Sequence, residues 1–139
     1  MTSGTAGYSG TALAKKLGIE EGSMVFAIGQ PEDYVALLAP LPPAVRFGKT
    51  LAADVDLVHL FTADAAELEM QLPRILSKLR ADAVIWVSWP TKAAKVPTDL
   101  TEDVIRAVAL PLGLVDTQVC AVNEVWSGLK LVIGKSLRK

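Results

Sequence analysis

The chain contains one cysteine and one histidine, two side-chain types that often act as nucleophile, base or metal ligand. Cys120 lies in the apolar run 119–122, where a free cysteine behaves as a small hydrophobic residue. His59 lies between Val58 and Leu60, in a segment typical of a buried strand. A cysteine–histidine nucleophile pair would require the fold to bring these two residues together. We favour a buried, slowly reacting thiol and a structural histidine.

These counts exclude several kinds of site. One cysteine cannot form an intrachain disulfide, and a structural zinc site needs about four cysteine or histidine ligands. No serine lies in a G-x-S-x-G turn, because Ser127-Gly128 is only a fragment of one. We therefore expect no metal in one chain, assign no catalytic residue, and lean towards a protein that is not an enzyme.

The polar segment from Pro90 to Asp99 is the best candidate for binding a small anion. It carries Lys92, Lys95 and Thr98 directly after an apolar strand, and ligands of open α/β sheets gather at the carboxyl ends of strands. We add Tyr8 to this candidate ligand site. The alternative interpretation is structural, because the acidic residues from Asp99 to Asp103 balance the lysines and suit the start of a helix.

The segment Gly29–Asp33 is where a Rossmann domain would carry its glycine-rich cofactor loop. It has one glycine, Pro31 lacks an N–H donor, and Glu32 and Asp33 would repel a phosphate. No acidic residue follows the short strand expected at 45–47, where a ribose contact would lie. We predict no cofactor, and no tight binding of S-adenosylmethionine or NAD.

Three tryptophans could anchor a partner. Trp86 lies within an apolar strand and belongs to the core, whereas Trp89 and Trp126 lie near strand ends. Tryptophan is enriched at binding hot spots but also fills cores. In the closing hairpin we take Trp126, Gly128 and Lys130 as candidate partner-facing residues, because a strand glycine leaves a hollow that another chain can approach.

The first half of the chain predicts a helix, a strand, a helix and an edge strand. A helix beginning at Ser9 or Thr11 should end at Gly18, and the apolar run 24–28 should be a strand covered on both faces. A second helix should have Pro31 at its first position and stop at Pro40. Residues 45–47 form the expected short edge strand.

The second half is more regular. We expect buried strands at 56–61 and 83–89, with a helix between them that starts at the capping-box pair Asp64 and Glu67 and is kinked or split at Pro73. A further helix should be capped by Thr98 or Asp99 and run to about Leu112. The β-rich runs 114–122 and 125–133 are separated by only two residues, which predicts an antiparallel hairpin.

Strands that alternate with helices predict an α/β fold with a mostly parallel sheet. We expect a Rossmann-like three-layer sandwich of five or six strands ending in an antiparallel hairpin, with residues 83–89 near the sheet centre. The expected order of the elements is like that of methyltransferases, but the chain lacks the glycine-rich cofactor loop. Residues 1–8 should be a flexible tail and residues 9–139 a single domain.

Composition narrows the class of partner. The chain has 139 residues, 51% hydrophobic, and a formal net charge of −1. A net charge near zero argues against binding to nucleic acid. No apolar run approaches the ~20 residues of a membrane span. The first ten residues do not have the pattern of a signal peptide. We therefore expect a cytoplasmic protein without nucleic-acid or membrane partners.

Several short segments together resemble a known family. They are Gly7–Thr11, Trp89-Pro90, Asp99–Asp103 and Cys120–Leu129. On these segments, and in element order and length, the chain resembles the actinobacterial domain-of-unknown-function family numbered three-zero-five-two. The resemblance implies a Rossmann-like fold in a bacterial cytoplasm. It implies no activity and transfers no catalytic residue.

Two functions remain open. The leading hypothesis is a non-catalytic binding or regulatory module that self-associates or meets another protein. The alternative is a small-molecule or anion-binding domain, or a weak enzyme, that uses the loop 90–99. A pocket lined by Tyr8, Lys92 and Thr98 would favour the ligand-binding hypothesis. A flat apolar patch around Trp126 would favour the hypothesis of a protein partner.

Overall fold

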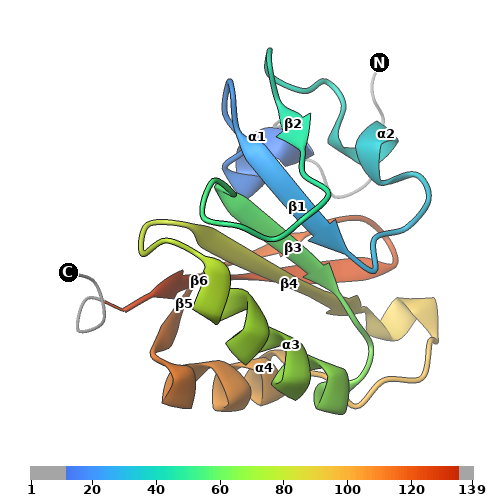
Figure 1. Ribbon diagram of the computed structural model, residues 1–139. Helices are drawn as coiled ribbons and strands as arrows, with labels where there is room; N and C mark the ends of the chain where they lie inside the picture. Colours follow the sequence, from blue (N-terminus) through green and yellow to red (C-terminus); the bar gives the residue numbers. More distant parts are fainter. Residues whose placement is uncertain (1–11, 135–139) are drawn as a thin grey trace.

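The structure, a computed structural model that describes residues 12–134, is built on a sheet of six strands in the order β2-β1-β3-β4-β6-β5 (Figure 1). The first four strands pair in parallel, and β6 runs antiparallel to both β4 and β5. The expected mostly parallel sheet with a closing hairpin is confirmed. The strands are β1 (Met24–Ile28), β2 (Arg46–Phe47), β3 (Leu57–Phe61), β4 (Val84–Pro90), β5 (Leu114–Ala121) and β6 (Trp126–Ile133).

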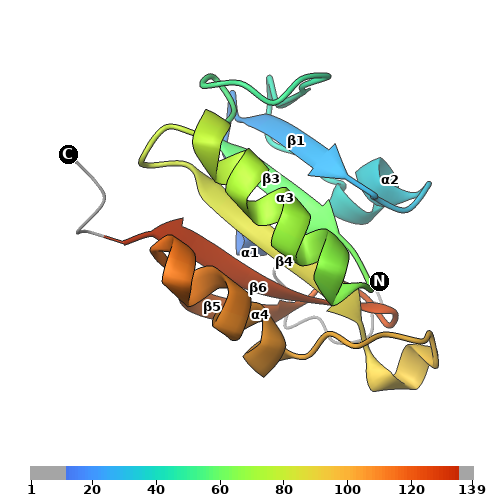
Figure 2. The same cartoon turned by 60° about the horizontal axis from the view of Figure 1, so that its bottom comes forward.

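Helices cover both faces of the sheet, which gives the expected three layers (Figures 1 and 2). One face packs against α1 (Leu13–Leu17) and α2 (Tyr34–Leu38), and the other against α3 (Ala65–Lys78) and α4 (Glu102–Ala109). Two short 3₁₀ helices, Lys92–Ala94 and Leu110–Leu112, complete the elements. Successive strand side chains point to opposite faces, so each of the two core layers takes alternate residues of β3.

The strand β4 lies between β3 and β6, as its unbroken apolar character predicted. Trp86 points into the layer of α1, where its indole N–H donates to the carbonyl oxygen of Leu17 at 2.8 Å. Val87 and Trp89 point into the layer of α3 and α4. Burial on both faces explains why this strand reads as a continuous hydrophobic run.

Two expectations about helix starts are wrong, and one of the two effects expected of Pro73, a split of the helix, is absent. Pro31 lies in a turn before α2, because the N–H of Tyr34 donates to the Pro31 carbonyl and the helix begins only at Tyr34. The helix α3 is not split at Pro73. Pro73 and Glu69 both lie on its exposed side, so the carbonyl that loses its intrahelical N–H can bond to water.

The third difference concerns the start of α4. Its N-cap is Thr101, whose hydroxyl accepts from the N–H of Val104 at 3.2 Å. Thr98 and Asp99 instead bind the segment before α3. Thr98 donates to the carbonyl of Ala63 at 2.7 Å, and Asp99 accepts from the N–H of Ala65 at 2.8 Å. These two hydrogen bonds therefore hold the loop after β4 against the start of α3.

The closing hairpin turns as expected at Asn123. Its side-chain oxygen accepts from the N–H groups of Val125 and Trp126, both at 2.9 Å. Leu129 and Leu131 of β6 are fully buried. Within residues 12–134, no helix is both long and apolar enough to cross a bilayer.

Candidate functional site

The chain reverses its direction of travel across the sheet between β1 and β3, and in open α/β sheets this is where ligands bind. The carboxyl ends of the two strands approach closely there. Gly29, directly after β1, has a φ of +69°, and a Cβ at this position would lie 2.6 Å from the carbonyl oxygen of Phe61. Only glycine suits this junction.

The loop that follows does not fit a nucleotide or S-adenosylmethionine bound in the usual mode. The helix α2 has five residues, and Asp33 precedes it without making a side-chain cap. Beside it lies a hollow of about 340 Å³, lined in part by Pro31, Tyr34 and Phe47. Pro31 offers no N–H to an anion, and β2 is followed by Gly48 rather than by a carboxylate that could hold a ribose.

A chain of three polar side chains crosses the core beneath this loop. The Tyr34 hydroxyl lies 2.9 Å from Nδ1 of His59, and Nε2 of His59 lies 2.7 Å from Oγ of Ser88. His59 and Ser88 are fully buried and Tyr34 is almost so. A neutral imidazole has one donor and one acceptor nitrogen, so a single neutral tautomer satisfies both contacts.

The surroundings of this trio keep it uncharged. The rings of His59 and Phe61 stack at a centroid distance of 4.2 Å, and Tyr34 meets both rings edge-on. Burial lowers the pKa of His59 to about 3 and raises the pKa of the Tyr34 hydroxyl well above its usual value. All three groups therefore remain neutral over the physiological range.

The trio has the distances of a nucleophile, a base and an orienting group, but His59 and Ser88, which would be the base and the nucleophile, are fully buried and no substrate can reach them. It is a hydrogen-bonded core network, and the expected structural role of His59 is confirmed. Sequence reasoning did not identify Tyr34 or Ser88 as its partners. The available signal was Ser88 itself, one hydroxyl within the apolar strand β4.

Cys120 lies in the same core layer but does not pair with His59. Its Sγ donates to the carbonyl of Ala121 at 3.4 Å, and its exposed fraction is 8%. Burial raises the pKa of this thiol, and the positive charge of Lys16 only partly opposes the effect. The expectation that Cys120 is buried is confirmed.

A hollow of about 530 Å³ lies beside the carboxyl end of β4. Lys92 and Thr98 both line it, whereas Lys95 does not, and Tyr8 falls outside the described residues. Apolar groups dominate its wall, among them Trp89, Val96 and Leu100, and Ser127, the cross-strand neighbour of Trp89, also lines it. The Glu102 carboxylate, which also lines the hollow, is paired with Arg106. Among the described residues that line the hollow, the Lys92 ammonium is therefore the charged group without an ion-pair partner.

The three candidate partner-facing residues do not form one surface. Trp126 is half-buried and meets Phe61 edge-on at a centroid distance of 5.1 Å. Gly128 is buried, and Trp86 occupies the space beside it, with Cε3 lying 3.2 Å from where a Cβ would be. Lys130 lines a different hollow, near the amino ends of the strands.

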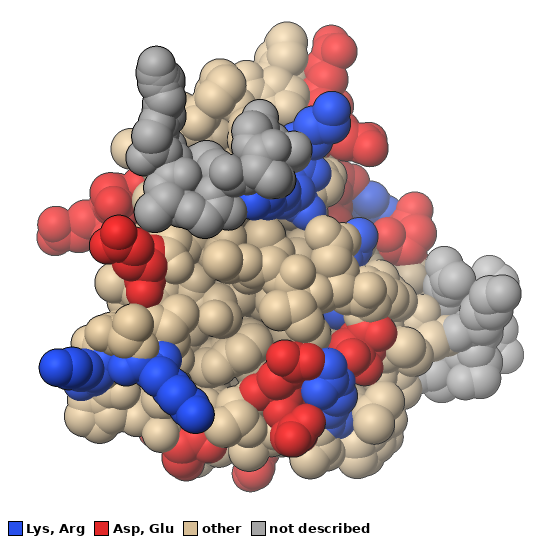
Figure 3. Space-filling view, turned by 180° about the vertical axis from the view of Figure 1, so that it is seen from behind, with Lys and Arg blue, Asp and Glu red and all other residues tan. Residues whose placement is uncertain are grey.

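The surface of the hairpin still has apolar character. Seen from behind the view of Figure 1, an uncharged area crosses the middle of the molecule and charged side chains lie around its margin (Figure 3). β5 is an edge strand and exposes Val115 and Val119, whose exposed fractions are 42% and 52%. Arg106 of α4 holds this strand through Asp116, with its Nε 2.8 Å from the carboxylate.

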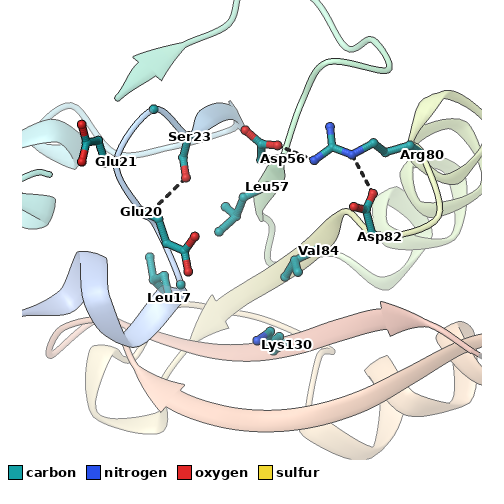
Figure 4. Close-up of a pocket in the computed structure, with 12 residues that line it drawn as sticks. Leu17, Glu20, Glu21, Ser23, Asp56, Leu57, Arg80, Asp82, Val84 and Lys130 are labelled. Atoms are coloured by element: carbon teal, nitrogen blue, oxygen red, sulfur yellow. Dashed lines mark hydrogen bonds and ion pairs between the residues drawn. The ribbon is translucent and has the colours of Figure 1, made fainter. Parts of the chain in front are cut away.

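At the opposite end of the sheet, a hollow of about 440 Å³ opens between α1 and the amino ends of β1, β3 and β4 (Figure 4). Asp56, Arg80 and Asp82 form one side, and Glu20 the other. No cluster of three or more histidine, cysteine, aspartate or glutamate residues within 12–134 has the arrangement of a metal site.

No family model and no curated protein matches the chain. Among solved structures, a SAM-dependent methyltransferase from Aquifex aeolicus superposes with a TM-score of 0.60 at 16% identity, over 87% of each chain. The ribosomal protein L11 methylase of Lactobacillus delbrueckii subsp. bulgaricus gives 0.56 at 12% identity, over 88% of this chain and 75% of that one. Fibrillarin from Aeropyrum pernix, with natively bound S-adenosyl-L-methionine, superposes with a TM-score of 0.51 at 12% identity, over 86% of this chain and 73% of that one. These likenesses show a shared Rossmann-like fold.

Proposed function

We propose that the chain is a non-catalytic binding or regulatory module on a methyltransferase-like scaffold, and that its ligand occupies the hollow beside β4. The observation that carries this proposal is the meeting of Lys92 with Trp89 and Leu100 around one cavity at the carboxyl end of a central strand. A cavity of a few hundred cubic ångströms, mostly apolar with a few polar groups, is typical of small-molecule sites.

The charge of this hollow selects the class of ligand. Among the described residues, its one unpaired cation is Lys92, and Glu102 is already neutralised by Arg106. The Thr98 hydroxyl is held in place, because it donates to Ala63 and accepts from the N–H of Leu100. A small monocarboxylate with an apolar or aromatic body would match these groups, its anion at Lys92 and its body against Trp89.

The loop after β1 supports a function other than methyl transfer. Its single glycine, Pro31 and the one-turn helix α2 provide no cradle for S-adenosylmethionine. Within the described residues, no histidine or cysteine lines the hollow beside β4. These features favour binding over catalysis.

Thermal-shift and calorimetric titration with S-adenosylmethionine and a series of aromatic and aliphatic monocarboxylates test the proposal. We expect saturable binding of a carboxylate, lost in Lys92→Met and kept in the matched control Lys95→Met. Micromolar binding of S-adenosylmethionine, or equal effects of the two lysine substitutions, would overturn it.

A second candidate, self-association, is favoured by the edge strand β5 and its exposed valines. A second copy that added its own β5 would pair the free edge and cover Val119. Light scattering across a concentration series should then show a dimer that Val119→Asp converts to a monomer. A monomer at every concentration would exclude this candidate.

We further propose that the chain belongs to the family numbered three-zero-five-two. Three of the segments that carry this resemblance have structural roles. Trp89-Pro90 lines the hollow beside β4, Thr101 caps α4, and Asn123 turns the hairpin. The segment Gly7–Thr11 lies outside the described residues.

A further inference from the structure

We propose a second site, independent of the proposed function, in the hollow at the amino ends of β1, β3 and β4. It would bind a small α-amino acid with a basic side chain. Its volume of about 440 Å³ lies within the range of small-molecule sites. Val84, which is half-buried, supplies an apolar wall for the ligand's carbon chain.

One side of the hollow is rigid because its charged groups bind one another. Arg80 pairs with Asp56, and its Nε lies 2.6 Å from the Asp82 carboxylate. Its Nη1 also donates to the backbone carbonyls of Ala53 and Val55 at 3.1 and 3.2 Å. The second Asp56 oxygen accepts from the Met24 N–H at 2.7 Å. This side therefore has fixed geometry and an excess of one negative charge.

The opposite side presents a carboxylate on a structured turn. The Glu20 N–H donates to Oγ of Ser23 at 2.9 Å, and the Ser23 N–H donates to the Glu20 carbonyl at 3.0 Å. In Figure 4 the Glu20 carboxylate points into the hollow, whereas Glu21 points away from it. Glu20 has no ion-pair partner among residues 12–134, so its carboxylate is available to a ligand.

Lys130 supplies the complementary charge. It extends from β6 to the hollow, next to Val84 in Figure 4, and has no ion-pair partner in the described part of the chain. An ammonium and a carboxylate that both face one cavity match a zwitterion, with the ligand's α-ammonium at Glu20 and its α-carboxylate at Lys130. The extra negative charge near Asp56 and Asp82 favours a second positive group on the ligand's side chain.

Isothermal titration with L-arginine and three analogues, at constant ionic strength, tests each contact. Agmatine lacks the carboxylate, N-acetyl-L-arginine lacks the α-ammonium, and L-norleucine lacks the side-chain cation. We expect each analogue to bind about tenfold more weakly than L-arginine, which is the expected contribution of one charged hydrogen bond.

Variants assign those losses to residues. Lys130→Gln should remove the difference between L-arginine and agmatine, and Glu20→Gln the difference between L-arginine and N-acetyl-L-arginine. Glu69→Gln and Lys49→Gln, exposed residues that do not line this hollow, should leave all four affinities unchanged. If Lys130→Gln does not fold, the comparison of L-arginine with agmatine on the wild-type protein still tests the contact with the ligand's carboxylate. No saturable heat at millimolar L-arginine, or equal binding of all four compounds, would overturn the proposal.

Discussion

His59 of β3 and Ser88 of β4 share a 2.7 Å hydrogen bond across neighbouring parallel strands, inside a core layer that water does not reach. Tyr34 of α2 holds the other ring nitrogen at 2.9 Å. The three residues thus join a short helix to the two central strands. Because every nitrogen of this neutral histidine is satisfied, the network holds α2 on the sheet without a buried charge.

Acid should weaken the fold through His59. Burial lowers the pKa of His59 to about 3, whereas an unfolded histidine titrates near 6.5. The stabilisation is therefore complete above about pH 6.5 and is lost as the pH falls towards 3, because only the unfolded chain takes up the proton. From pH 6.5 to pH 5 the free energy of unfolding should drop by about 2 kcal/mol from this residue.

Urea denaturation at pH 6.5 and pH 5 measures this effect, with His59→Asn as the comparison. His59 is the chain's one histidine, so the difference between the two proteins isolates its contribution. The variant should be less stable at both pH values and should lack the histidine part of the pH dependence. Identical pH dependence in the two proteins would show that His59 titrates normally in the folded state.

Gly29→Ala should destabilise the protein more than Gly18→Ala. Both glycines have positive φ angles, +69° and +88°, so both alanines carry the cost of the left-handed conformation, about 1–2 kcal/mol. At Gly29 the new Cβ would also lie 2.6 Å from the Phe61 carbonyl oxygen, whereas nothing lies within 4 Å at Gly18. Chemical denaturation measures the free energy of unfolding of both variants. Equal losses of stability would mean that β1 and β3 can move apart at Gly29 without an energetic cost.

Cys120 should react slowly with a thiol reagent at neutral pH. The side chain is buried, and burial raises its pKa, so both access and the thiolate fraction are reduced. Labelling with a chromogenic disulfide should be slow in buffer and complete rapidly in denaturing urea. Fast labelling of the native protein would place Cys120 on a mobile or open part of the surface.

Trp126→Ala distinguishes a core role from a partner-binding role. The ring packs on Phe61 and is half-buried, so its removal should cost about 3 kcal/mol, the lower end for large core truncations. Val119→Ala, at an exposed position of the same hairpin, is the control and should change stability little. An unchanged melting temperature with a lower apparent mass in light scattering would instead identify Trp126 as an interface anchor.

Local signals predicted the strands better than the helix ends. The runs 24–28 and 83–89 were recognisable because only burial on both faces explains unbroken apolar sequence. The start of α4 was not, because Thr98, Asp99 and Thr101 are all suitable caps. Which of them caps α4 depends on the start of α3, more than thirty residues earlier, which binds Thr98 and Asp99.

The candidate sites divide in the same way. That Lys92 follows a buried strand is a local fact, and so is the unsuitability of Pro31 for binding a phosphate. That Lys92 shares a cavity with Ser127, or Lys130 with Glu20, depends on β6 inserting between β4 and β5. The sequence by itself determined the α/β class, the central strand and the hairpin, because hydrophobic periodicity and turn chemistry act over a few residues. Only the tertiary structure decided the partners of His59 and the lining of each hollow, because these contacts join segments whose separation along the chain leaves no local pattern.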